Sequence, residues 1–148
     1  MPPQEAGWTC SACSLAWVLR ATGLNPSADE WSAVNEIGSG SMCGGSVNIT
    51  PSVGLCNANG PALQDVYARY GQATQQAWLN FDAVYELAQQ TTGQMSGASW
   101  YHWVGIRGTD GDAIAVANSA PGYKSIYSTL TRADFERLGG FSVVWLVE

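Results

Sequence analysis

One segment near the N-terminus constrains the fold more than any other part of the chain. It follows a short polar loop, and after Cys10 it is apolar at position 13 and throughout residues 15–19. Such a run covers most of the circumference of a helix, which is typical of a helix buried at the centre of a domain. We expect this helix over residues 10–22, because Gly23 is suited to cap its C-terminal end.

Cys10 lies in the first turn of this expected helix, where backbone N–H groups are unpaired and the helix dipole is positive. Both effects favour the thiolate, which is the nucleophilic form of cysteine. Gln4 lies six residues earlier. Its side-chain amide could donate to the oxyanion that forms when the sulfur attacks a carbonyl group. The segment therefore predicts a nucleophilic cysteine with a lowered pKa.

A nucleophilic cysteine needs a base, and the chain has a single histidine, His102. Asn118 follows sixteen residues later. A turn at residues 108–111 would join two antiparallel strands and bring both side chains to the same edge of a sheet. Gln4, Cys10, His102 and Asn118 then correspond to an oxyanion donor, a nucleophile, a base and the residue that orients the base.

The order of these four residues resembles that of the papain-like cysteine peptidases. The segment Cys10–Leu19, with the glycine that ends its helix, is most similar to the branch that contains the bacteriocin-leader (double-glycine) processing peptidases. The His-Trp-Val string at residues 102–104 also resembles this branch, as do the Asp-Gly turn, the strand and the Pro-Gly loop that follow it. The similarity covers roughly residues 4–23 and 100–147.

Two positions depart from the pattern of that branch. Ser11 stands where the family usually has glycine, and Asn118 followed by Ser119 stands where the branch commonly has Asp-Pro. The resemblance implies a papain-like fold, a Cys-His-Asn mechanism in which Cys10, His102, Asn118 and Gln4 are catalytic, and no need for a metal or cofactor.

The substrate stays open at this point. Hydrolysis of a peptide or of a peptidoglycan stem, as in stand-alone cell-wall lytic modules such as phage endolysins, is our first expectation. Processing of a leader peptide is the second, and an inactive papain-like domain that binds a peptide is the third. The N-terminus lacks the features of a signal peptide, and no apolar run approaches the ~20 residues of a membrane helix. The protein would then act where it is made, or reach the cell wall by another route.

The four cysteines, Cys10, Cys13, Cys43 and Cys56, allow three interpretations. They could form a zinc site, although the second pair is too widely spaced for a typical one. Cys10 and Cys13 could form a redox Cys-x-x-Cys pair at a helix N-terminus. We favour a catalytic Cys10, a buried core Cys13, and a loop that Cys43 and Cys56 either close as a disulfide or carry as free thiols.

The length of 148 residues suits one domain, residues 1–148, with its own core. The formal net charge is −6, with only six Lys and Arg residues. Because no basic stripe is present, nucleic-acid binding is not expected. The acidic balance is mild evidence for a neutral or cationic substrate.

The first two thirds of the chain read as helices and the last third as strands, which predicts an α+β fold with a helical half packed on an antiparallel sheet. Cys10 would lie on one wall of the cleft between these halves and His102 on the other. Residues 38–60 read as a long loop, which is either a lid or substrate wall, or an insertion without a role. The expected elements are helices from about Ala28 to Gly38 (with a Ser27–Glu30 capping box and an inner stripe of Trp31, Val34 and Ile37), from Pro61 to Gly71, after Asn80, and after a Thr131–Asp134 capping box, and strands at 72–79, 94–98, 101–107, 112–118 and 141–147.

Overall fold

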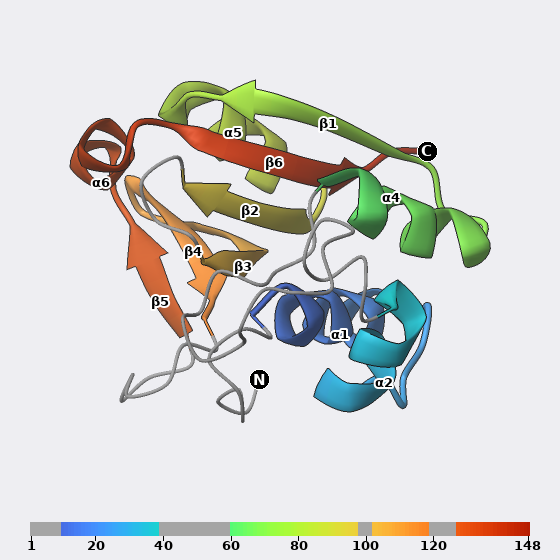
Figure 1. Ribbon diagram of the computed structural model, residues 1–148. Coiled ribbons are helices and arrows are strands. Elements are labelled where there is room, and N and C mark those ends of the chain that lie inside the picture. The colour runs from blue at the N-terminus through green and yellow to red at the C-terminus, as the bar shows by residue number, and fades with distance from the viewer. Residues whose placement is uncertain (1–9, 39–59, 98–101, 119–126) are drawn as a thin grey trace, which may run out of the picture.

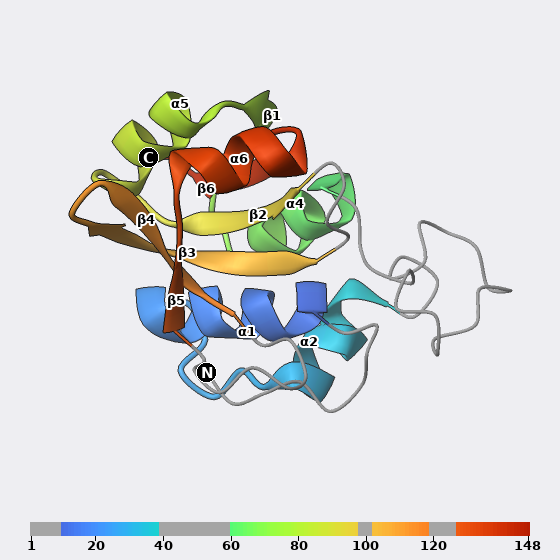
Figure 2. The same ribbon diagram turned by 90° about the vertical axis from the view of Figure 1, so that its left-hand side faces the viewer.

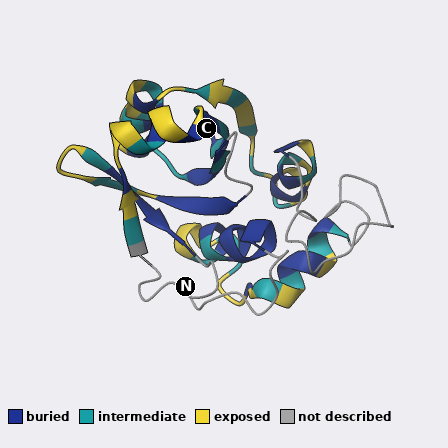
Figure 3. Ribbon diagram, turned by 60° about the vertical axis from the view of Figure 1, so that its left-hand side comes forward, coloured by how far each residue is buried: buried dark blue, intermediate teal, exposed yellow. Residues whose placement is uncertain are grey.

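A helix that is apolar around most of its circumference needs cover on every side, and α1 (Cys10–Thr22) has it. Its residues are buried from Cys10 to Ala16 and again at Val18 and Leu19. It contacts α2 (Glu30–Ile37) and two central strands of the sheet. Figure 3 shows α1 as the most continuously buried helix of the molecule. The central helix predicted from residues 10–22 is therefore confirmed.

The structure is a computed structural model, and it describes residues 10–38, 60–97, 102–118 and 127–148. The predictions for Gln4, and for a disulfide between Cys43 and Cys56, lie outside these residues.

The described strands form one six-stranded antiparallel sheet in the order β1-β6-β2-β3-β4-β5. Helices α1, α2 and α4 lie on one face of this sheet, and α5 and α6 lie on the other (Figures 1 and 2). The helical half comes first in the chain and most of the sheet follows, so the predicted α+β class is confirmed. The remaining helices are α4 (Gly60–Arg69), α5 (Phe81–Ala88) and α6 (Arg132–Leu138), and the strands are β1 (Thr74–Leu79), β2 (Gly93–Gly97), β3 (Trp103–Asp110), β4 (Ala113–Ala117), β5 (Tyr127–Leu130) and β6 (Phe141–Leu146).

Alternating residues of the central strands supply two separate cores. Trp103 and Val144 point to the core that contains α1, whereas their neighbours Val104 and Val143 point to the core under α5 and α6. This division follows from the period of two in a β-strand. Every residue of β3 near its start is thus covered by a helix, on one face or the other.

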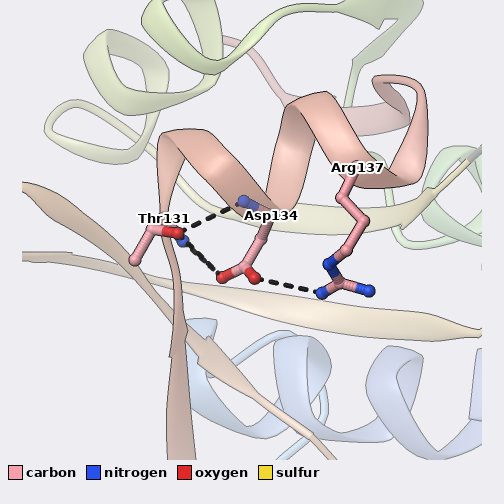
Figure 4. A network of polar contacts seen from close by, with 3 residues as sticks. All are labelled: Thr131, Asp134 and Arg137. Carbon is pink, nitrogen blue, oxygen red and sulfur yellow. Dashed lines mark hydrogen bonds and ion pairs between the residues drawn. The ribbon is translucent and has the colours of Figure 1, made fainter.

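Local capping signals explain where several helices begin. Asn80 accepts a hydrogen bond from the backbone N–H of Ala83 and so caps α5. Thr131 and Asp134 form the predicted reciprocal capping box of α6, and Arg137 pairs with the same carboxylate (Figure 4). Such caps satisfy N–H groups that the helix itself leaves unpaired.

The prediction for α2 is confirmed for the burial of Val34 and Ile37 and wrong for its capping box and for Trp31. The capping box is formed by Asp29 and Ser32 rather than by Ser27 and Glu30, so the helix begins at Glu30. Its buried stripe runs through Ala33, Val34 and Ile37, and Trp31 is 43% exposed instead of facing the core. The Asp29 box prevails because its side-chain and backbone bonds are both made.

Two predictions for the sheet also need correction. The β3–β4 turn lies at residues 111–112, and β3 continues to Asp110 past a register shift between Ile106 and Gly108. The strand β5 was not predicted, because its four residues are too few to show a clear period. Even so, the two strands pair as expected, with Gly105 opposite Ala117.

Gly105 allows the ring of Trp17 to lie directly on β3. A Cβ atom at position 105 would come within 2.6 Å of the Trp17 ring. We therefore predict that Gly105→Ala lowers the free energy of unfolding by about 1–3 kcal/mol through overpacking, as measured by urea unfolding. In a strand with free space at that position, the same Gly→Ala change would instead stabilise the protein.

The double variant Gly105→Ala/Trp17→Leu supplies the control. If the clash is the cause, the cost of Gly105→Ala shrinks when the ring is already gone. An equal cost in both backgrounds would show that Trp17 is not the obstacle.

Candidate active site

The sulfur of Cys10 lies against the start of β3. Cys10 is the first residue of α1 and is 1% exposed. The backbone N–H of Trp103 donates a hydrogen bond to Cys10 Sγ at 3.2 Å, across 93 positions of the sequence. Since His102 directly precedes Trp103, the packing of α1 on β3 brings the predicted nucleophile to the strand that carries the predicted base.

His102 and Asn118 meet at one edge of the β3–β4 pair, as predicted. His102 Nε2 lies 2.7 Å from Asn118 Oδ1, and both side chains are buried. An amide oxygen can only accept a hydrogen bond, so Nε2 carries the proton. The lone pair of the neutral ring is then on Nδ1, and this nitrogen is the basic one.

Burial disfavours the charged form of both Cys10 and His102. Desolvation raises the pKa of Cys10 to about 12, although the backbone N–H groups of Trp103, Ser11 and Cys10 act in the opposite direction. Desolvation also lowers the pKa of His102 below its usual range, against a smaller effect of the bond to Asn118. The lowered thiol pKa expected from the helix N-terminus was therefore wrong, because water is excluded from the sulfur.

A neutral thiol and a neutral imidazole are still suited to base-assisted attack. A thiol with a high pKa is activated only when a base takes its proton during the attack, and a neutral imidazole is such a base. The site thus suits concerted proton transfer better than a standing thiolate and imidazolium.

The other cysteine of α1 has a different environment. Cys13 is 3% exposed and packs with Ala117 and Trp17, as expected for a small core residue.

Across the residues that the structure describes, no group of three His, Cys, Asp or Glu side chains could hold a metal ion. The described part of the chain also contains no helix long and apolar enough to cross a membrane.

Sequence reasoning missed a buried polar cluster under the first turn of α1. Gln94 of β2 donates to the backbone oxygen of Ser11 and to the hydroxyl of Ser14, and it accepts from the hydroxyl of Tyr67. The signal in the sequence was weak: a glutamine in a short strand does not indicate which face of the sheet it will occupy.

A separate cavity of about 940 Å³ lies between α5, the β1–β6 edge and the C-terminal end of α1, and Leu87, Trp145 and Thr22 are among its lining residues. Thr22 is twelve residues along the helix from Cys10, which corresponds to about 18 Å of helix rise. This cavity contains none of the predicted catalytic residues and is not the site of their chemistry.

No protein-family model matches the chain, and a search of curated proteins finds no match. Solved structures do match, over almost the whole chain. A double-glycine-motif protease from an AMS/PCAT transporter, in complex with the leader peptide, has a TM-score of 0.64 at 16% identity and covers 99% of this chain and 89% of its own. A putative C39-like peptidase from Bacillus anthracis has a TM-score of 0.67 at 15% identity and covers 98% and 91%.

A third structure is the peptidase domain of Streptococcus ComA, a bifunctional ABC transporter involved in quorum sensing. Its TM-score is 0.66 at 10% identity, with 99% of this chain and 97% of that domain covered. The resemblance in fold to the double-glycine branch of the papain-like peptidases, expected from residues 4–23 and 100–147, is therefore confirmed.

The bond between His102 and Asn118 gives a prediction for the charge of the imidazole. In Asn118→Asp a carboxylate would face Nε2 at about the present distance, and a neighbouring opposite charge raises a histidine pKa by about 1–3 units. We expect the pKa of wild-type His102 to lie below about 6.5 and that of the variant to lie well above the wild-type value.

His102 is the only histidine, so a ¹H NMR titration follows one unambiguous ring signal. Asn80→Asp is the matched control, because Asp caps a helix as well as Asn does and adds the same charge on the other face of the sheet. An unchanged His102 pKa in Asn118→Asp would contradict the proposed pairing.

Proposed function

We propose that this chain is a cysteine peptidase that hydrolyses peptide bonds by a Cys-His-Asn mechanism and that it processes a leader-type peptide at a pair of glycines. One observation carries the proposal. The N–H of Trp103 binds the sulfur of Cys10, and the residue that precedes Trp103 is a histidine whose Nε2 lies 2.7 Å from Asn118 Oδ1. This arrangement supports the roles of nucleophile, base and orienting group for Cys10, His102 and Asn118.

In the proposed reaction, His102 Nδ1 takes the proton of the Cys10 thiol as Sγ attacks the carbonyl carbon of the scissile bond. The imidazolium then gives this proton to the leaving amine, and an acyl-enzyme remains on the sulfur. Water attacks the acyl group in the second half of the reaction, with His102 again as the base. Asn118 keeps the ring in the tautomer that both steps require.

The tetrahedral intermediate of each step carries an oxyanion. We assign its stabilisation to the backbone N–H of Cys10 and to the side-chain amide of Gln4, which stays a prediction from the sequence. Each such donor is commonly worth about 2.7–4 kcal/mol in the transition state.

The burial of the sulfur supports a substrate with small residues at the cleavage point. Cys10 is only 1% exposed, so a peptide must bring its carbonyl carbon close to an enclosed sulfur. Glycine has no side chain to obstruct that approach. The matching structures include a double-glycine-motif protease in complex with the leader peptide. These structures favour leader-type peptides as substrates. Our first expectation, hydrolysis of peptidoglycan stems, has no support among the matching structures.

Cleavage of a synthetic peptide with a central Gly-Gly pair tests the proposal. We expect wild-type protein to cleave at the Gly-Gly pair and Cys10→Ala to lose about 10⁴-fold or more in rate, because removing the nucleophile removes the covalent route. Mass spectrometry gives the cleavage site, and circular dichroism shows whether the variant is folded.

Cys13→Ala is the control, since it removes the other buried sulfur of the same helix, which packs with Ala117 and Trp17. Activity that survives in Cys10→Ala and disappears in Cys13→Ala would transfer the nucleophile to Cys13. Cleavage of peptidoglycan fragments, with the Gly-Gly peptide left intact, would restore the cell-wall substrate. If wild-type protein binds the Gly-Gly peptide and cleaves neither substrate, the chain is a binding domain.

A further inference from the structure

Five buried polar groups, three side chains and two backbone oxygens, connect α4 and β2 to the first turn of α1. The hydroxyl of Tyr67 lies 2.7 Å from Gln94 Oε1, and Gln94 Nε2 lies 2.9 Å from the Ser11 backbone oxygen and 2.7 Å from Ser14 Oγ. Ser14 Oγ lies 2.8 Å from the backbone oxygen of Cys10. The side chains of Tyr67, Gln94 and Ser14 are fully buried. The cluster therefore ends on the residue proposed as the nucleophile.

The chemistry of the groups sets the direction of every hydrogen bond in this cluster. The amide oxygen of Gln94 only accepts, so the Tyr67 hydroxyl must donate to it. Burial raises the pKa of Tyr67 well above its usual value, which keeps that hydroxyl protonated. The amide nitrogen of Gln94 uses its two protons on Ser11 and Ser14, so the hydroxyl of Ser14 gives its own proton to the Cys10 carbonyl.

A fully paired cluster in a low-dielectric interior is directional and costly to disturb. Apolar packing alone would let the first turn of α1 slide or rotate slightly on the sheet. The hydrogen bonds from Gln94 oppose such a movement, because each of them requires a particular distance and angle. Strand β2 also pairs with β3, with Gln94 opposite Gly105 and Ser96 opposite Trp103.

Resting on the function proposed above, we infer that Gln94 is a positioning residue, whose side-chain amide holds the first turn of α1 on β2 so that Cys10 Sγ stays aligned with His102, which directly precedes β3. The hydroxyl of Tyr67 orients the amide of Gln94. The hydroxyl of Ser14 connects this amide to the carbonyl oxygen of Cys10 through two hydrogen bonds. Two links then locate the nucleophile: the Trp103 N–H on its sulfur and the Gln94 amide under its backbone.

The test compares Gln94→Met and Ser14→Ala with a matched control on the same helix. Thr22 Oγ1 donates to the backbone oxygen of Val18 at 2.7 Å, which is the same bond, four residues back, that Ser14 makes to Cys10 at 2.8 Å. Thr22→Val removes this bond at the other end of α1. Three quantities are measured for each variant: kcat and KM on the Gly-Gly peptide, the rate of Cys10 alkylation by iodoacetamide at pH 7 located by mass spectrometry, and the urea midpoint.

We expect Gln94→Met and Ser14→Ala to lower kcat about 10–100-fold with KM unchanged, since a small misplacement of the nucleophile affects the chemical step rather than binding. The alkylation rate of Cys10 falls with kcat, and Thr22→Val matches wild type in both rates. A loss of stability in Gln94→Met and Ser14→Ala with wild-type kcat and alkylation would overturn the inference and leave a purely structural cluster.

Two further arms keep the test decisive. If Gln94→Met does not fold, Ser14→Ala and Tyr67→Phe decide the result, with Tyr85→Phe as the control, because the Tyr85 hydroxyl binds the Gly111 oxygen away from α1. If wild-type protein cleaves no peptide, the proposed function fails. The alkylation rates then judge the positioning role on their own: slower alkylation in Ser14→Ala than in Thr22→Val supports it, and equal rates overturn it.

Discussion

The burial of α1 against the middle of the sheet is the interaction on which the rest of the structure depends. Because this helix is covered by β2 and β3 on one side and by α2 on another, its first residue lies against the start of β3, which His102 directly precedes. A helix with one apolar stripe could pack at the surface and leave its N-terminus in water. A helix buried from Cys10 to Ala16 has no such freedom.

The same exclusion of water determines the charge state of the site. It raises the pKa of Cys10 and lowers that of His102, which disfavours the charged form of each. In the proposed reaction, attack assisted by a base takes the place of a preformed thiolate. Exclusion of water also requires that every polar group under α1 be paired. The amide of Gln94 is paired at both its oxygen and its nitrogen and, in our proposal, also keeps Cys10 aligned with His102.

Much of the fold and the core of the site followed from local and periodic signals. The caps at Asn80 and Thr131 were predicted because they depend on neighbouring residues alone. The meeting of His102 and Asn118 was predicted because a hairpin of antiparallel strands brings its two open ends together even when the turn is misplaced. The capping box of α2 and the strand β5 were missed, since two capping boxes competed in one case and four residues carried no clear period in the other.

By itself, the sequence determined that α1 would be buried and that a cysteine, a histidine and an asparagine would stand at the ends of their elements, because hydrophobic period and turn spacing are properties of the chain. Only the tertiary structure decided the protonation of Cys10 and the role of Gln94. Desolvation depends on what covers the sulfur from every direction, and the partners of Gln94 lie 27 and 80 or more positions away in the chain. The desolvation of the sulfur and the contacts of Gln94 both arise only when the sheet and the helices pack together.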